Sequence, residues 1–262
     1  MALDHKQFED VACLRCKVKR LGTSIPVWLY ALDDLLVDTG PSTLRSRITP
    51  WLQELRPGQA ALTHIHEDHS GLASWLQNKV RIPVYLPAGS VDLARHRAKL
   101  PFYRWLFWGP RPAFEPSPMP EELVSSGGRR ILPISTPGHM EEHVSFFEPE
   151  QGRLFSGDLY VRSRPTLGFI DERMDLMIRS LQACLQLDFQ TLFCAHAGIV
   201  EDGKQALQKK LDYLLELQER KHELEQQGMS LHQMDRFLFP KKPLITFLSC
   251  GEWSSRHLLR TL

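Results

Sequence analysis

Long apolar runs and an excess of one charge are both absent from this sequence of 262 residues. No run of about 18 or more apolar residues occurs, so we expect no membrane-spanning helix. The first residues carry charges where a secretory leader needs an apolar segment, and we therefore expect a cytoplasmic protein with no membrane partner. The 32 Lys and Arg residues balance 31 Asp and Glu residues to a net charge of +1, which argues against a nucleic-acid partner.

Cysteine is too sparse and too irregularly spaced for a disulfide framework. The five cysteines are an odd number, which suits a reducing compartment. Cys13 and Cys16 have the C-x-x-C spacing of redox and zinc sites, yet no second such pair completes a four-cysteine zinc site. We favour the alternative that both belong to a strand of an N-terminal sheet.

Composition and patterning predict a globular α/β protein. Hydrophobic residues make up 42% of the chain and charged residues 24%, as in ordinary globular proteins. Strand and helix patterns alternate through the first hundred residues, which is typical of the α/β class. No internal repeat or linker divides the chain, so we expect one domain over 1–262, with a core over 1–200 and a helical extension over 201–262.

The periodicity of apolar residues predicts the positions of individual elements. Strands are expected at 11–20, 25–38, 60–62, 82–86, 131–135, 144–147, 152–156 and 191–194. Helices are expected at 42–56, 69–79, 89–100, 171–187, 203–227, 230–239 and 251–260. Pro50 lies inside the first of these helices, where it could break or kink it.

Residues 101–120 depart from this alternation because they are rich in aromatic residues and prolines. Such a composition is poor material for a regular strand or a long helix, so we expect a loop insertion. Trp105, Phe107 and Trp108 could line an apolar substrate pocket. A loop folded onto its own small core and a homodimer contact are the alternatives.

The segment 63–71 has the density of metal-binding side chains that a metal site requires. His64, His66, Asp68 and His69 follow a short apolar strand with the spacing H-x-H-x-D-H. Residues two apart on an extended segment point to the same side, so the first two histidines can bind one ion. Asp68 and His69 follow where the chain turns into a helix and would face a neighbouring point. Imidazole and carboxylate suit zinc, iron or manganese, whereas packing these groups without a metal would carry a desolvation penalty.

Further metal-type residues each follow the end of a predicted strand, namely Asp38, His139, Asp158 and His196. An aspartate in the position of Asp38 either orients a ligand histidine or caps a turn. His143 has no feature that separates it from a surface residue, and we interpret it as structural. Arg162, soon after Asp158, could face an anionic substrate group, although a surface arginine is the favoured interpretation.

Taken in order, five motifs resemble those of the metallo-β-lactamase-fold superfamily: 36–40, 63–71, 136–139, 156–158 and 194–198. The small size and the helical C-terminal third resemble the glyoxalase II-like branch. This resemblance implies a four-layer αββα sandwich with two divalent metal ions at one edge, zinc above all, with manganese or iron also open. It implies that the first ion is bound by His64, His66 and His139, and the second by Asp68, His69 and His196. Asp158 would bridge both ions, and Asp38 would orient a ligand histidine.

The resemblance also implies a reaction. A metal-bridging hydroxide would attack the ester, thioester or lactone carbonyl of a small molecule, with Asp68 and Asp158 as the catalytic carboxylates. The chain lacks the basic C-terminal pattern that binds glutathione in hydroxyacylglutathione hydrolases. An iron-dependent persulfide dioxygenase on the same scaffold, a phosphodiesterase and a non-enzymatic binder are the alternatives. We further expect an apolar acyl or ring portion of the substrate to pack near Trp105 and Trp108.

Overall fold

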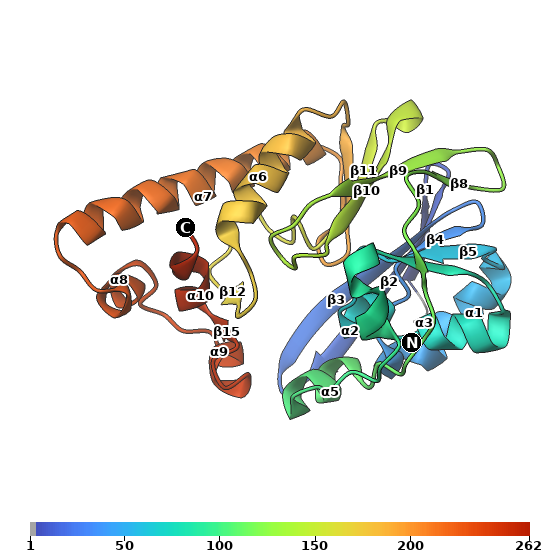
Figure 1. Cartoon of the computed structure of the whole chain (residues 1–262), viewed down its shortest axis with the longest axis horizontal. Helices are drawn as coiled ribbons and strands as arrows, with labels where there is room; N and C mark the ends of the chain where they lie inside the picture. The colour runs from blue at the N-terminus through green and yellow to red at the C-terminus, as the bar shows by residue number, and fades with distance from the viewer. Residues whose placement is uncertain (1–3) are drawn as a thin grey trace.

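The computed structural model describes residues 4–262, and its centre is a pair of β-sheets (Figure 1). The first sheet is built in chain order from β1 (Asp4–Phe8), β2 (Val11–Arg20), β3 (Thr23–Leu32), β4 (Leu35–Val37), β5 (Gln59–Ala61), β6 (Val84–Leu86) and β7 (Ser117–Pro118). The second has the order β14 (Gly198–Val200), β13 (Thr191–Cys194), β11 (Arg153–Gly157), β10 (Val144–Glu148), β9 (Arg130–Ser135) and β8 (Leu123–Val124). Strands β4 to β7 are parallel, so their carboxyl ends meet at one edge.

Alternation along the strands gives each sheet two apolar faces. Tyr30 from β3 packs between the sheets against Phe155 and Phe193 of the second sheet, with ring centroids 5.7 Å and 5.2 Å away. On β2, Cys13 belongs to this inner cluster and Cys16 to the cluster on the outer face. The two cysteines therefore point to opposite sides of one strand, which confirms the strand interpretation of this pair.

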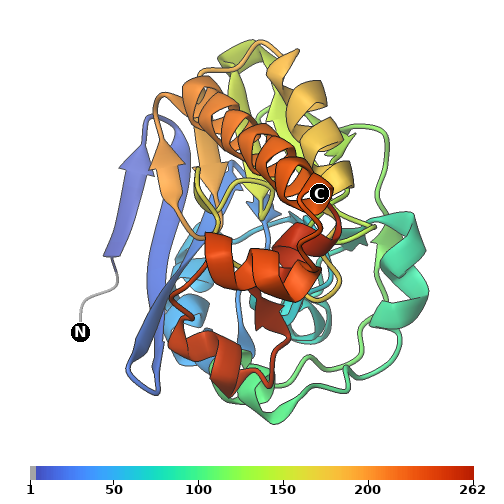
Figure 2. The ribbon, with the colours of Figure 1, turned by 90° about the vertical axis from the view of Figure 1, so that its left-hand side faces the viewer.

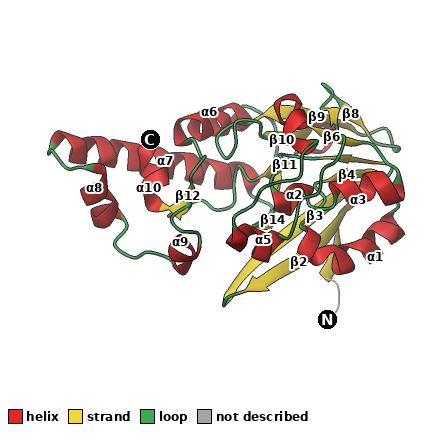
Figure 3. Ribbon diagram, turned by 60° about the horizontal axis from the view of Figure 1, so that its bottom comes forward, coloured by secondary structure: helices red, strands yellow, loops and turns green. Residues whose placement is uncertain are grey.

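Helices cover the outer face of each sheet (Figure 3). The first sheet is covered by α1 (Arg45–Leu55), α2 (Glu67–Ser70), α3 (Ala73–Trp75), the π-helical turn η2 (Leu76–Val80), α4 (Val91–Ala94) and α5 (Phe102–Trp108). The second sheet is covered by α6 (Met174–Leu185) and α7 (Gly203–Gln226), which run side by side in Figure 2. The expected four-layer αββα sandwich is therefore confirmed, because each sheet buries one face on the other sheet and one on helices.

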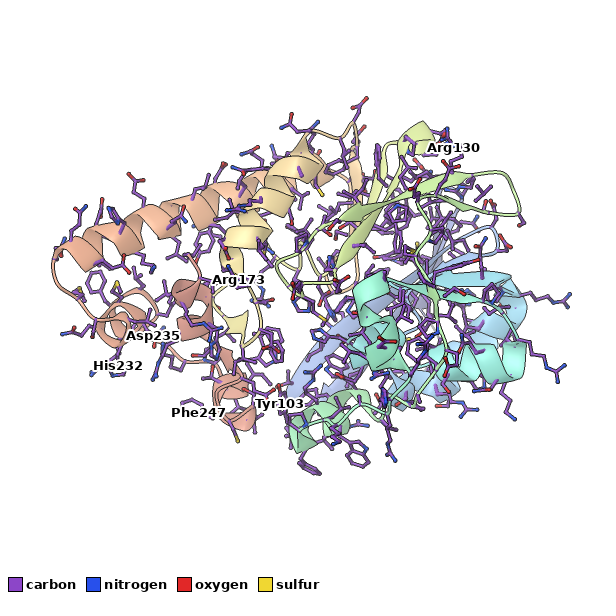
Figure 4. The ribbon with its side chains drawn as sticks, in the orientation of Figure 1. Tyr103, Arg130, Arg173, His232, Asp235 and Phe247 are labelled. Carbon is purple, nitrogen blue, oxygen red and sulfur yellow. The ribbon has the colours of Figure 1, made fainter. Side chains whose placement is uncertain are left out.

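The C-terminal third is helical, as expected, with α7, α8 (Leu231–Leu238), α9 (Leu244–Leu248) and α10 (Ser255–Arg260). The carboxylate of Asp235, labelled in Figure 4, ties α8 to α10 by accepting a hydrogen bond of 2.5 Å from Ser255 Oγ. The two-residue strand β15 (Trp253–Ser254) pairs with β12 (Gly168–Phe169) in a separate two-stranded sheet. Among residues 4–262, no helix is long and apolar enough to cross a membrane.

Three expected elements differ from the structure. The helix expected at 89–100 is only a 3-10 turn, η3 (Ala88–Ser90), followed by the single turn of α4. The expected loop at 101–120 contains the seven-residue helix α5, which starts after Pro101 and ends at Gly109 with a φ of +79°. The helix expected at 251–260 begins only at Ser255, because the residues before it pair with β12. Pro50 lies within α1 without ending it.

Candidate metal centre

The first part of the site is built where β4 and β5 end side by side. Asp38 follows β4 in the left-handed conformation, with a φ of +59°. Its Oδ1 accepts a hydrogen bond of 2.8 Å from the backbone N–H of Thr63, just beyond β5. Its Oδ2 accepts one of 2.8 Å from Nδ1 of His69. Because Nδ1 of His69 donates to Asp38, the lone pair of Nε2 is free for a metal ion.

Three histidines form the first half of the centre, His64, His66 and His139. Nδ1 of His66 lies 3.0 Å from Nε2 of His64 and 3.0 Å from Nε2 of His139. Burial and the neighbouring histidines hold the pKa values of His64 and His66 well below the usual range. Neutral imidazoles with converging nitrogen atoms are the form in which histidine binds a metal.

Two aspartates and two histidines form the second half, Asp68, His69, Asp158 and His196. Nε2 of His196 lies 3.2 Å from Oδ2 of Asp68, and Nε2 of His69 lies 3.7 Å from the same oxygen. Burial opposes charge in this group, but the two carboxylates raise the pKa of both histidines and the histidines lower the pKa of Asp68. A divalent cation would supply the positive charge that the histidines otherwise take up as protons.

The carboxylate of Asp158 lies between the two halves. Its Oδ1 is 3.4 Å from Nε2 of both His69 and His196, whereas its Oδ2 is 3.4 Å from Nε2 of His139. One oxygen therefore faces each half of the centre. This is the arrangement that a carboxylate bridging two metal ions requires.

The donor set fits divalent cations. Nε2 of His69 and Oδ1 of Asp158 are buried, and neither has a hydrogen-bond partner within the described part of the chain. Such buried polar atoms are costly unless a metal or another partner satisfies them. Imidazole and carboxylate donors suit zinc, iron or manganese rather than a soft ion that requires thiolates.

One carboxylate of the site, Glu172, was not predicted from the sequence. Its Oε1 accepts a hydrogen bond of 2.7 Å from Nδ1 of His139, and its Oε2 accepts one of 2.9 Å from the backbone N–H of Phe169. Glu172 therefore orients the ring of His139 through Nδ1, as Asp38 orients the ring of His69. The acidic run around it in the sequence gave no sign of this contact.

His143, which we interpreted as structural, does not lie on the surface, because it is only 1% exposed. Burial and the nearby His139 lower the pKa of His143 to about 3, so the ring is neutral. Its Nδ1 lies 2.8 Å from Oγ1 of Thr136, and its Nε2 accepts a hydrogen bond of 3.2 Å from the backbone N–H of Asp158. His143 thus holds the backbone of Asp158.

Of the predicted pocket residues, the structure places Trp108 beside the centre. Its ring centroid lies 6.3 Å from that of His196. Phe107 is 2% exposed in the core under the first sheet, so its prediction as a pocket residue was wrong. Trp105 is 48% exposed and stacks on Phe102 instead. Arg162 lies exposed in the loop that follows Asp158, which agrees with the favoured interpretation of it as a surface arginine.

Helix α5 is also tied to the metal-binding segment. Arg104 donates hydrogen bonds of 3.0 Å and 2.6 Å to Oε2 of Glu67. Glu67 is buried, and its neighbours in the sequence are the candidate ligands His66 and Asp68. Tyr103, labelled in Figure 4, donates a hydrogen bond of 2.6 Å to Glu252 in the C-terminal segment. The helix therefore joins the metal-binding segment to the C-terminal third.

A family model described as the metallo-beta-lactamase superfamily matches residues 27–196, a range that includes every candidate ligand. The chain belongs to this superfamily. A hydroxyacylglutathione hydrolase of Nitrosomonas europaea is 27% identical over 232 residues, covering 83% of this chain and 76% of the relative. An atrochrysone carboxyl ACP thioesterase of Aspergillus fumigatus is 24% identical, covering 73% of this chain and 56% of the relative. A second hydroxyacylglutathione hydrolase, from Yersinia enterocolitica, is 28% identical over 64% of this chain and 60% of the relative.

Solved structures of superfamily members share the fold. A metallo-beta-lactamase family protein from Thermus thermophilus superposes with a TM-score of 0.72 at 20% identity, over 97% of this chain and 93% of its own. A beta-lactamase domain protein from Burkholderia ambifaria also gives a TM-score of 0.72, at 18% identity, over 97% and 87% of the two chains. The chain is thus a metallo-hydrolase of this superfamily, similar to the glyoxalase II-like members, although it spans less than two thirds of the thioesterase and of the Yersinia enzyme.

Proposed function

We propose that this enzyme hydrolyses a thioester, or a related ester or lactone, of a small molecule with two divalent cations, zinc being the best suited. The observation that carries the proposal is the carboxylate of Asp158, whose two oxygens face the two halves of the centre. The ligands proposed for the first ion are His64, His66 and His139, and those for the second are Asp68, His69 and His196, with Asp158 shared.

When bound, a pair of divalent cations lowers the pKa of water and stabilises negative charge on a substrate oxygen. The protein contributes orientation. Asp38 and Glu172 hold the rings of His69 and His139 through Nδ1. We assign to the Asp68 carboxylate the task of accepting a hydrogen bond from the attacking water. Asp158 keeps the two halves at a fixed separation.

The proposed substrate class rests on the relatives and on the ring of Trp108. One relative is named a thioesterase and others are named hydroxyacylglutathione hydrolases, which favours a thioester. Trp108 lies beside His196, and its side chain is half-buried, so one part of the ring is open to solvent. An apolar acyl group would pack against this ring. All five cysteines are unpaired, as is usual in a reducing compartment, and we therefore propose that the enzyme acts on a small molecule in the cytoplasm.

Metal analysis coupled to a substrate screen tests the function. The purified protein, supplied with zinc, manganese or iron, is assayed on acyl thioesters of increasing chain length, lactones, phosphodiesters and β-lactams. We expect about two zinc or manganese ions per chain and thioester turnover that a chelator abolishes. A single iron with oxygen uptake on a persulfide and no hydrolysis would overturn the proposal in favour of a dioxygenase.

The acyl pocket has its own test. Trp108→Ala is expected to raise KM for long acyl thioesters about tenfold and to leave short ones almost unchanged, because each buried methylene is worth about 0.8 kcal/mol. Trp105→Ala removes the same kind of side chain from the exposed part of α5 and serves as the matched control. Equal effects of the two variants, or no effect of either, would contradict the assignment of Trp108.

A further inference from the structure

Lys210 is a buried lysine of α7 that faces the loop after Asp158. Its residue is 3% exposed, whereas lysine is almost never fully buried unless it is paired. Its Nζ donates hydrogen bonds of 2.5 Å to the backbone carbonyl of Leu159 and of 3.0 Å to that of Tyr160. These are the two residues that follow the carboxylate between the halves of the centre.

The position of Lys210 in α7 is one where an apolar residue would ordinarily be found. The buried neighbours of Lys210 on this helix are all apolar, namely Ala206, Leu207, Leu211 and Leu214. Within residues 4–262, no carboxylate lies at ion-pair distance from the ammonium group, so its hydrogen bonds go to backbone carbonyls. Burying a lysine in this way carries a desolvation cost that a leucine or methionine would avoid.

The loop that Lys210 holds is fixed from two other directions. The backbone N–H of Asp158 donates to Nε2 of His143, and the backbone N–H of Leu159 donates to the carbonyl of Ser156. Lys210 adds hydrogen bonds to the carbonyls of Leu159 and Tyr160 in the same loop. Together they determine the direction in which the Asp158 side chain leaves the backbone.

We propose that Lys210 is a positioning residue for the metal centre. By holding the carbonyls of Leu159 and Tyr160, it keeps the Asp158 carboxylate between the two sets of ligands. The inference rests on the proposed metal centre and goes beyond it, because it assigns to the C-terminal helical region a part in metal binding. Lys210 lies outside the segments that supply the ligands.

The test measures metal binding directly. Lys210→Met replaces the ammonium by an apolar side chain of similar length, and Lys209→Met makes the same change at the adjacent, exposed position of α7. Zinc dissociation constants are measured by chelator competition, and Co²⁺ absorption spectra report the geometry of the ligands. We expect Lys210→Met to bind zinc about 10- to 100-fold more weakly and to alter the Co²⁺ spectrum, as loss of a residue that orients a ligand does. Lys209→Met should match the wild type.

The outcomes separate this inference from the proposed function. If the wild-type protein binds neither zinc nor Co²⁺, the metal centre itself is wrong, and the inference falls with it. If the wild type binds both but Lys210→Met, shown to be folded by circular dichroism, has the same affinity and spectrum, the role of Lys210 alone is overturned. Should Lys210→Met fail to fold, Lys210→Gln, which keeps one donor without the charge, is expected to fold and to lose at least about fivefold in zinc affinity. Wild-type affinity in that variant would equally overturn the proposal.

Discussion

At the scale of single residues, the site depends on carboxylates that hold histidine rings as much as on the candidate ligands. Asp38 holds His69 in one half of the centre, and Glu172 holds His139 in the other, each through Nδ1 at 2.8 Å and 2.7 Å respectively. Each carboxylate leaves Nε2 of its histidine directed at the centre. This arrangement orients the ring and makes the metal-facing nitrogen more basic.

Replacing Glu172 by glutamine should weaken metal binding without removing a ligand. The amide is a poorer acceptor for Nδ1 of His139 and is neutral, so we expect zinc affinity to fall about 10- to 100-fold. Metal content after dialysis against a chelator series measures the change. Glu201→Gln, an exposed position just after β14, is the matched control. Unchanged zinc affinity in Glu172→Gln would show that the contact with His139 does not support the centre.

The protonation of Lys210 should make stability depend on pH. Burial lowers the pKa of this lysine from 10.5 to about 8 in the folded protein. At a pH between these two pKa values, Lys210 is protonated in the unfolded chain and neutral in the folded chain. The free energy of unfolding therefore rises with pH across this range, by about 3 kcal/mol in total. Lys210→Met lacks this contribution. Urea unfolding of both proteins is measured in a chelator from pH 7 to 10.5. The free energy of unfolding of the wild type should rise relative to that of Lys210→Met as the pH rises. Parallel curves would contradict the prediction.

At the scale of elements, helix α5 is the clearest case of a segment placed by contacts from distant parts of the chain. Tyr103 contacts Glu252, Arg104 contacts Glu67, and Thr43 Oγ1 donates a hydrogen bond of 2.9 Å to the carbonyl of Phe107. The guanidinium of Arg104 also lies 5.2 Å from the ring centroid of Phe169. These contacts keep Trp108, at the end of the helix, beside His196.

Breaking the ion pair of Arg104 should destabilise the protein. Arg104→Met leaves the Glu67 carboxylate, whose side chain is 5% exposed, without its partner. Because the arginine side chain keeps some exposure, we expect a loss of about 2 to 3 kcal/mol in the free energy of unfolding, toward the low end for buried pairs. Urea unfolding measures it. Arg130→Met, at an exposed pair with Glu122 far from the site, should change stability by less than the error (Figure 4). A loss in Arg130→Met equal to that in Arg104→Met would contradict the argument from burial.

At the scale of the whole molecule, the centre joins the two sheets. His64 and the residues after it come from the carboxyl end of β5 in the first sheet. His139, Asp158 and His196 follow β9, β11 and β13 of the second sheet. A metal ion bound between these segments connects both halves of the sandwich. Binding should therefore favour the folded state over the unfolded one.

Zinc should raise the thermal stability of the whole protein. At a free zinc concentration of 100 times the dissociation constant, each site adds about 2.7 kcal/mol, and a protein of this size gains about 2 to 4 °C in Tm for each kcal/mol. Differential scanning calorimetry of metal-free and zinc-loaded protein measures the shift. Calcium, which prefers all-oxygen ligands, should leave Tm unchanged. The same Tm with and without zinc would contradict binding between the sheets.

The local pattern of the chain was sufficient to predict most strands and helices and to single out the metal-type residues at the strand ends. The sandwich and the division of the ligands between two ions were implied by the resemblance to the superfamily. Strand periodicity and the spacing H-x-H-x-D-H are local properties, because side-chain direction repeats every two residues on a strand. The ends of parallel neighbouring strands meet at one edge, so residues at those ends could be expected to gather. Asp38 was foreseen on this basis.

Only the tertiary structure decided which residues support that site and which do not. Glu172 and His143 contact candidate ligands, and Lys210 contacts the loop after Asp158. Their segments have the local patterns of an ordinary loop, strand start and helix face. Helix α5 forms in a segment whose composition predicted a loop, because contacts to Thr43, Glu67 and Glu252 hold it. Burial and long-range hydrogen bonding depend on how distant segments pack together. No local pattern carries that information, since it arises only when the sheets and helices are assembled.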